Sequence, residues 1–189
     1  MCSSDLHGSL TYIDATQAIG WLPFAADAFD FVSCAGYKWL LSPRGTAFGV
    51  VRPERLGMLR PLYAGWYSGE DIWTSIYGPP LRLAPDARRL DISPAWLAWV
   101  GTVPALELLN DVGVDAIHRH DVALANAMRA RLGLPPSDSA IVTANTQGGL
   151  ERLGAAGVKA AVRAGAVRLS FHLHNTEADV DAVARALGR

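Results

Sequence analysis

The stretch DATQAIG at residues 14–20, followed by FDFVSCAGYKWLLSPRG at residues 29–45, decides how the whole chain is interpreted. Asp14, Gln17 and Lys38 stand at the ends of short apolar runs, where a charge or an amide risks burial. A buried polar group costs free energy unless it has a partner. The sequence therefore predicts that something is bound where these three side chains meet.

The apolar runs around these residues predict three strands, at 10–14, 29–34 and 46–52. Gly, Pro and Asp bound each run, and continuous apolar runs of this length are typical of strands buried on both faces of a parallel or mixed sheet. This pattern indicates an α/β fold. The segment TQAIGWL, at 16–22, is expected to form a short helix between the first two strands.

The middle of the chain changes from loop to helix. Residues 53–93 are rich in proline and glycine, which predicts a long irregular loop, and loops of this length are usually functional or disordered. Two consecutive helices are expected at 94–111 and 114–133, because apolar residues recur there with helical spacing. Pro104 is expected to kink or break the first of them.

The last third of the chain predicts a small α+β domain distinct from the opening sheet. Its elements are expected in the order strand, helix, strand, helix, at 140–144, about 150–165, 166–171 and 176–188. Thr176 followed by Asp179 three residues later is a signal for the start of the final helix.

Composition restricts the class of protein. The 189 residues are 50% hydrophobic, enough for one sizeable core and a small appendage. A net charge of -1 without a basic block makes nucleic acid and anionic membranes unexpected partners. Cys2 and Cys34 form neither a disulfide framework nor a metal-ligand cluster, and no apolar run is long enough to span a bilayer, which predicts a cytoplasmic protein. Residues 1–8 carry no signal-peptide, strand or helix pattern and are expected to be a non-native start.

Asp14, Gln17 and Lys38 are the residue types that pyridoxal 5'-phosphate (PLP) requires. A carboxylate keeps the pyridine nitrogen protonated, an amide donates to the phenolic oxygen, and a lysine amine forms a Schiff base with the aldehyde. Asp14 and Gln17 follow one strand and Lys38 follows the next, so we expect them to share the crevice at the carboxyl ends of these strands.

Three segments, IDATQAIG, AGYKWLLSPRG and VRLSFHLHNTEADVD, resemble in this order the motifs of class V aminotransferases. The resemblance covers residues 9–189 and implies the fold of aspartate aminotransferase. Residues 9–93 would then be the second half of the PLP-binding large domain, with a mixed, mostly parallel sheet. Residues 94–189 would be connecting helices and a small C-terminal α+β domain, and the N-terminal half of the large domain would be missing.

The same resemblance implies a role for five residues. Asp14 would pair with the pyridinium nitrogen, and Gln17 would contact the phenolic oxygen. Lys38 would carry the internal aldimine, and Tyr37 would bind the cofactor phosphate. Arg168 would clamp the carboxylate of an amino-acid substrate, a task that suits its bidentate fork.

Two departures from the family pattern affect these roles. Many relatives have His directly before the lysine and Ser three residues before it, whereas this chain has Tyr37 and Ala35, so its phosphate contacts must differ. His174 stands where Tyr or Phe is usual, which leaves the roles of His172 and His174 open. These two histidines could share one face of a strand, yet no third metal ligand is evident, so no metal is expected.

The residues that hold PLP do not name the reaction. An amino acid or amine is the implied substrate and transamination the favoured chemistry, with epimerisation and carbon-sulfur lysis as alternatives. Residues 133–168 contain no cysteine for a desulfurase, and kynureninases typically carry His where Gln17 stands.

Two further expectations concern the whole protein. The resemblance implies a homodimer whose sites are completed by the loop at 65–78 of the partner. Without the N-terminal half, the apolar strands would lose their cover and the cofactor its main phosphate site, so the 189 residues alone are expected to aggregate and to lack turnover. The alternative from a different class is a complete, non-catalytic interaction domain.

Overall fold

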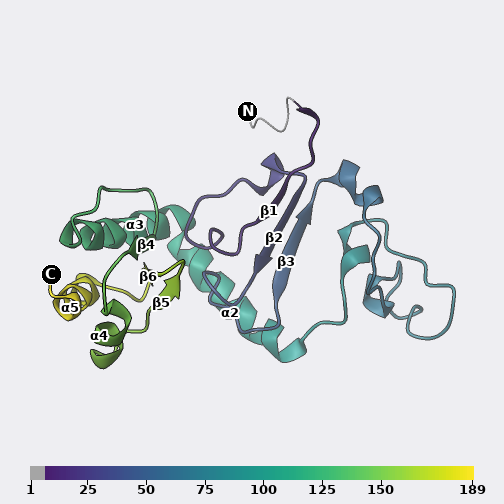
Figure 1. Cartoon of the computed structure of the whole chain (residues 1–189). Coiled ribbons are helices and arrows are strands. Elements are labelled where there is room, and N and C mark those ends of the chain that lie inside the picture. The colour runs from purple at the N-terminus through teal and green to yellow at the C-terminus, as the bar shows by residue number, and fades with distance from the viewer. Residues whose placement is uncertain (1–6) are drawn as a thin grey trace. The chain divides into compact units, whose positions relative to one another are not determined.

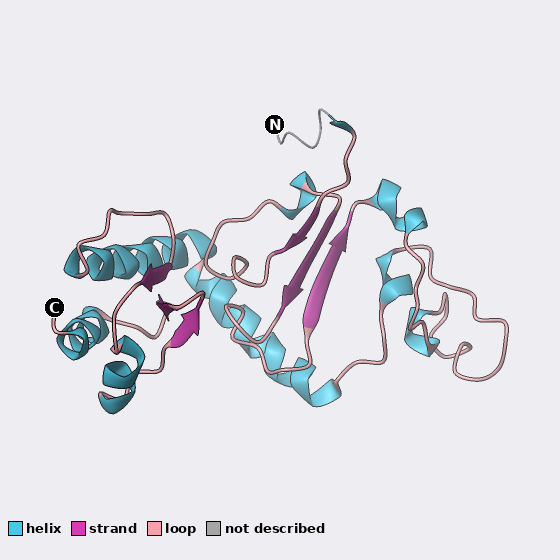
Figure 2. Cartoon of the chain, in the orientation of Figure 1, coloured by secondary structure: helices cyan, strands magenta, loops and turns pink. Residues whose placement is uncertain are grey.

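A computed structural model describes residues 7–189 of the chain (Figure 1). The chain divides into two compact units. Unit 1 comprises Met1–Ile19 and Phe24–Asp111, and unit 2 comprises Gly20–Pro23 and Val112–Arg189. Residues 7–189 form two three-stranded sheets, whose strands Figure 2 distinguishes from helices and loops. The segment 1–8, which the sequence predicts to be non-native, lies mostly outside the described residues.

The sheet of unit 1 is mixed, as predicted. It contains β1 (Tyr12–Asp14), β2 (Phe31–Ala35) and β3 (Ala47–Val51), in that order. β1 and β2 run parallel, with Asp14 opposite Ser33, whereas β2 and β3 run antiparallel. The apolar runs therefore mark the strands correctly.

The prediction that all three strands are buried on both faces is wrong for the outer two. The central strand β2 buries Val32 and Cys34, which are 3% and 2% exposed. Tyr12 of β1 is 63% exposed and Val50 of β3 is 43% exposed. Within the described part of the chain each outer strand has a single hydrogen-bonded neighbour, so less of its surface is covered.

The helix expected at 16–22 does not form. The backbone N–H of Ile19 donates to the carbonyl oxygen of Ala15 at 3.0 Å, which makes one helical turn. Gly20 then adopts a φ of 114°, which ends that turn. The regular element between β1 and β2 is instead the short 3-10 helix η1 (Ala26–Ala28).

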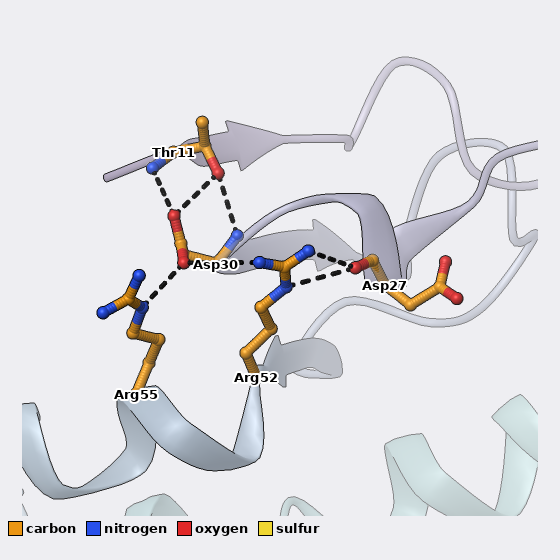
Figure 3. A network of polar contacts seen from close by, with 5 residues as sticks. All are labelled: Thr11, Asp27, Asp30, Arg52 and Arg55. Atoms are coloured by element: carbon orange, nitrogen blue, oxygen red, sulfur yellow. Dashed lines mark hydrogen bonds and ion pairs between the residues drawn. The ribbon is translucent and has the colours of Figure 1, made fainter. Parts of the chain in front are cut away.

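A polar network fastens the beginnings of β1 and β2 to the segment after β3 (Figure 3). Asp30, which is 5% exposed, accepts hydrogen bonds from the backbone N–H of Thr11 at 2.9 Å and from its hydroxyl at 3.1 Å. Arg55 donates to the same carboxylate at 2.8 Å, and Arg52 donates to the backbone carbonyl of Asp27. The Thr11 N–H and the Arg55 guanidinium lower the pKa of Asp30 from 3.8 to about 2.

Asp30→Asn is expected to destabilise the protein near neutral pH and to have little effect in strong acid. Because the pKa of Asp30 is lowered by folding, its contribution to stability is present above the unfolded pKa of 3.8 and disappears as the pH falls toward about 2. Urea unfolding near neutral pH and in strong acid would measure the difference in free energy of unfolding between wild type and variant. Asp27→Asn is the matched control, because its exposed carboxylate takes no part in the network. A gap that stays constant with pH would contradict the assignment.

The long loop predicted at 53–93 is confirmed, with short 3-10 helices inside it. They are η2 (Pro53–Met58), η3 (Trp66–Ser68) and η4 (Ala87–Leu90). The Arg88 guanidinium holds one turn of the loop by donating to three carbonyl oxygens, those of Tyr67, Gly69 and Glu70. The loop is therefore ordered by side-chain to backbone bonds where no sheet or long helix can do so.

The two consecutive helices are confirmed as α2 (Trp96–Val112) and α3 (Val114–Arg131). Pro104 does not break α2, which contains it in its interior. A proline removes one backbone hydrogen bond, and a helix of 17 residues retains the others. No helix among residues 7–189 combines the length and the apolarity needed to cross a membrane.

Unit 2 has the α+β composition that the sequence predicts. Its sheet is antiparallel, in the order β4 (Ile141–Ala144), β6 (Ala166–Ser170), β5 (Ala161–Arg163). The helices α3, α4 (Gly149–Ala155) and α5 (Glu177–Leu187) supply the rest of the core. Core residues include Leu124, Met128, Val142, Leu153, Val167, Leu169, Val180 and Val183. The predicted start of α5 is confirmed, since the backbone N–H of Thr176 donates to Asp179 at 2.8 Å.

The helix expected over 150–165 is wrong in its second half. The helix α4 ends at Ala155, and Gly157 follows with a φ of 75°. The chain then forms a hairpin in which a two-residue turn, Ala164 and Gly165 at φ 48° and 80°, joins β5 to β6. Pairing with β6 therefore prevails over the helical propensity of this alanine-rich segment.

Candidate active site

The parallel pairing of β1 with β2 brings the turn after β1 next to the loop after β2. The backbone N–H of Ala15 donates to Ser33 at 2.8 Å, which continues the ladder beyond Asp14. The hydroxyl of Thr16 accepts from the backbone N–H of Ala35 at 3.1 Å. Both polar segments are thus fixed at the same edge of the sheet, where the sequence places them.

Asp14 is an exposed carboxylate held by its own turn. Its Oδ1 accepts from the backbone N–H of Thr16 at 3.0 Å. Hydrogen bonds from Thr16 lower the pKa of Asp14, and the positive charge of Lys38 lowers it further. The carboxylate is therefore ionised at neutral pH and lies within electrostatic reach of Lys38. Asp14 is therefore not buried among the described residues, although its place at the end of an apolar run made burial a risk.

The turn that carries Lys38 is closed tightly behind it. The N–H of Gly36 donates to the carbonyl of Thr46 at 2.9 Å, and the N–H of Ser42 donates to Gly36 at 3.0 Å. A Cβ on Gly36 would lie 2.5 Å from the hydroxyl oxygen of Thr46, so this position requires glycine. Ser42 and Thr46 are buried, whereas Lys38 is half-buried, so a fixed turn presents a partly accessible amine.

Gln17 is held from the side by Trp39. The indole Nε1 of Trp39 donates to the side-chain Oε1 of Gln17 at 3.1 Å. Trp39 is 6% exposed and directly follows Lys38, so one loop supplies both the amine and the partner of the amide.

Two cations lie against the ring of Tyr37. The guanidinium carbon of Arg44 is 4.3 Å from the ring centroid, and Lys38 Nζ is 5.8 Å from it. Tyr37 is 38% exposed, and Arg44 is exposed as well. This cation–π cluster concentrates positive charge beside a phenolic hydroxyl, an arrangement that can receive a phosphate.

Arg168 belongs to unit 2, whereas Asp14, Gln17, Tyr37 and Lys38 belong to unit 1. Arg168 lies half-buried on the central strand β6, paired with Thr143 on one side and Ala161 on the other. Its contact with a substrate carboxylate stays a prediction.

A buried contact between a histidine and an aspartate follows β6 in unit 2. His172 Nδ1 is 2.9 Å from Asp121 Oδ2, and the two side chains are 7% and 0% exposed. The backbone N–H of His172 also donates to Asn175 Oδ1 at 2.9 Å. His172 is therefore engaged in the core of the unit, whereas His174 is exposed. Among residues 7–189, no group of three or more His, Cys, Asp or Glu side chains is arranged to hold a metal ion.

Sequence reasoning missed three residues that the structure adds to the site, Thr16, Trp39 and Arg44. The pattern Asp-x-Thr at residues 14–16 is a signal for an Asx turn, and it could have identified Thr16. Trp39 and Arg44 carry no such local signal, because their partners lie elsewhere in the sequence or depend on the path of the loop.

The fold and the site define an α/β protein with an acidic residue, an amide and a lysine at the carboxyl ends of two parallel strands. The family model "Aminotransferase class-V" matches residues 3–148. The chain belongs to the class V aminotransferase family, whose members are PLP-dependent enzymes.

Relatives within the family carry different activities. The protein named uncharacterized aminotransferase YcbU, from Bacillus subtilis (strain 168), is 29% identical over 192 residues, which covers 94% of this chain and 50% of that protein. Isopenicillin N epimerase from Streptomyces clavuligerus is 29% identical over 139 residues, which covers 68% of this chain and 34% of the epimerase.

Solved structures confirm the fold. The crystal structure of the cysteine desulfurase CsdA from Escherichia coli matches with a TM-score of 0.81 and 19% identity, over 99% of this chain and 53% of that one. At this identity the likeness concerns the fold alone. The chain spans about half the length of YcbU and of CsdA.

Proposed function

We propose that the whole protein carrying this chain is a PLP-dependent aminotransferase that acts on an amino acid or an amine. The observation that carries the proposal is the meeting of Asp14 and Lys38 at the carboxyl ends of β1 and β2, close enough for the lysine charge to lower the pKa of the carboxylate. Membership of the class V family supports it.

The residues present fit the proposed cofactor. An ionised Asp14 suits a protonated pyridine nitrogen, and the amide of Gln17 suits a phenolic oxygen. Lys38 supplies the amine for covalent attachment, and Tyr37 with Arg44 supplies a hydroxyl and a cation for the phosphate. When bound, PLP supplies an electron sink for the carbon that bears the substrate amine.

Three residues of the chain are proposed to have separate roles in the reaction. Asp14 is ionised and would keep a proton on the pyridine nitrogen of the bound cofactor. Lys38 Nζ would hold the cofactor and would also be the base that takes a proton from the substrate carbon and returns one. Arg168 is proposed to bind the substrate carboxylate with its two parallel N–H groups.

Epimerisation is the second candidate, because isopenicillin N epimerase covers 68% of this chain. It needs the same residues and differs in where the proton returns. Cysteine-dependent lysis is less favoured. Cys34, the cysteine among residues 7–189, is 2% exposed, and burial raises the pKa of its thiol, so it is a poor nucleophile.

The activity is proposed for the whole protein, because this chain spans about half the length of YcbU and of CsdA. We expect the 189 residues expressed alone to lack turnover. We also propose a homodimer. Leu97, Val100 and Val103 of α2 are 89%, 72% and 54% exposed, and apolar surface of this extent marks a contact with other protein. Light scattering would measure the assembly.

The functional test uses the whole protein, purified as its host organism produces it. It should be yellow or become yellow with PLP, and amino acids should convert the bound cofactor to its amine form while the keto acid appears. Inversion of the amino acid without keto acid would establish the epimerase, and release of sulfide would establish the lyase. A protein that binds no PLP would overturn the proposal in favour of a non-catalytic interaction domain.

Arg168→Lys is expected to raise the KM for amino acids by about 10- to 150-fold, because a bidentate contact worth about 1.5 to 3 kcal/mol is lost. The visible spectrum of the bound cofactor should hardly change. Arg163→Lys, an exposed residue on the neighbouring strand β5, is the matched control and should leave KM unchanged. Loss of cofactor with intact affinity for amino acids would show that Arg168 has a different role.

A further inference from the structure

The hydrogen bond between Trp39 and Gln17 joins the two loops of the candidate site. Trp39 Nε1 donates to Gln17 Oε1 at 3.1 Å, across 22 residues of sequence. Gln17 follows β1 and Trp39 follows β2, so the bond crosses between parallel strands that are neighbours in the sheet.

The chemistry of this bond fixes which way the amide of Gln17 points. A side-chain amide has an accepting end and a donating end, and rotation by half a turn exchanges them. An indole N–H can only donate, so the end of Gln17 that faces Trp39 must be the oxygen. The amide NH2 group is therefore directed away from the indole.

Trp39 itself has little freedom to move. Its side chain is 6% exposed, and the turn around it is closed by the bonds of Ser42 to Gly36 at 3.0 Å and of Leu41 to Lys38 at 3.0 Å. The turn that bears Gln17 is fastened to β2 through Thr16 and Ala35. Both partners of the bond are thus held by rigid surroundings, as a positioning contact requires.

We propose that Trp39 is a positioning residue that sets the amide of Gln17 so that its NH2 group donates to the phenolic oxygen of bound PLP. This inference rests on the proposed function. With the amide reversed, its oxygen would face the phenolic oxygen, and two acceptors would meet. The donor stabilises the ionised form of that oxygen, so Trp39 acts on the cofactor through Gln17.

The titration of the bound cofactor tests this role. Trp39→Phe removes the indole N–H and leaves an aromatic ring. We expect the pH midpoint of the visible absorbance to rise by about one unit, the size of shift that one hydrogen bond to a charged group causes. Gln17→Ala should raise the midpoint in the same direction. Adding Trp39→Phe to Gln17→Ala should cause no further change, because the indole then has no amide to orient.

Trp21→Phe is the matched control. Trp21 is 4% exposed, belongs to unit 2 and stacks on the ring of His118 at 5.7 Å between centroids. It should leave the midpoint unchanged. Incorporation of 3-benzothienylalanine at position 39 keeps the shape of the indole and removes its N–H, so it replaces Trp39→Phe if that variant does not fold.

The outcomes separate the inference from the proposed function. If wild-type protein and Trp39→Phe both bind PLP and share one midpoint, the inference is wrong and the proposed function stands. Additive shifts in the double variant would also overturn the inference, because they would show that Trp39 acts independently of Gln17. If the wild-type protein binds no PLP, both are overturned.

Discussion

Lys38→Ala is expected to reduce turnover by about 10²- to 10⁴-fold or more. One group that transfers a proton typically contributes a factor of this size to the rate. The variant should also lack covalently attached cofactor. Lys38 and Lys159 are the two lysines of the sequence, and they lie in different units. Lys38 follows β2 within electrostatic reach of Asp14, whereas Lys159 is exposed and lies between α4 and β5. Among the lysines of this chain, the attachment site is therefore decided between these two side chains.

Borohydride reduction of the holoenzyme followed by peptide mapping makes that decision. The label should appear on the peptide that contains Lys38, and Lys159→Ala should bind PLP and turn over substrate as the wild type does. A label on Lys159, or an active Lys38→Ala variant, would remove Lys38 from the mechanism. Recording the circular dichroism of each variant excludes unfolding as the cause of lost activity.

His172→Ala is expected to cost about 1 to 3 kcal/mol of stability, the cost of leaving a buried polar group without its hydrogen-bond partner. Asp121 is 0% exposed, and its Oδ2 lies 2.9 Å from His172 Nδ1. Its other carboxylate oxygen, Oδ1, is buried without a hydrogen-bond partner among the described residues. Removal of the imidazole would therefore leave a buried carboxyl group that has lost its hydrogen-bond partner.

Urea unfolding followed by circular dichroism measures this cost. His174→Ala is the matched control, because His174 is exposed and its ring centroid is 6.3 Å from that of His172. The decrease in free energy of unfolding should be much smaller for His174→Ala than for His172→Ala. Equal losses in the two variants would show that the pair with Asp121 is not the source of the stability. Because α3 carries Asp121 and His172 follows β6, the pair secures the helix to the sheet of unit 2.

Local patterns in the sequence predicted most of the regular structure. Apolar runs located β1, β2 and β3, and helical periodicity located α3. The Thr176 and Asp179 pair located the start of α5. Such signals succeed because propensity, periodicity and capping depend on residues within one or two turns of each other.

The errors arose where distant pairing decides the outcome. Residues 161–163 belong to an alanine-rich segment that favours a helix, yet they form β5 because β6 offers a hydrogen-bonding edge. The chemistry at the site divides in the same way. The types and order of Asp14, Gln17 and Lys38 are properties of the sequence, and they indicate PLP before any fold is known.

Only the tertiary structure decided how those residues are held. The sequence names Gln17 as an amide donor, but the direction of its amide depends on an indole 22 residues away. The local sequence indicates no role for His172, because its partner Asp121 lies on α3, 51 residues away in the sequence. Strand register and helix packing determine which side chains meet across such separations. A chain therefore carries its chemistry in its local sequence, whereas the orientation and burial of each group depend on contacts that form on folding.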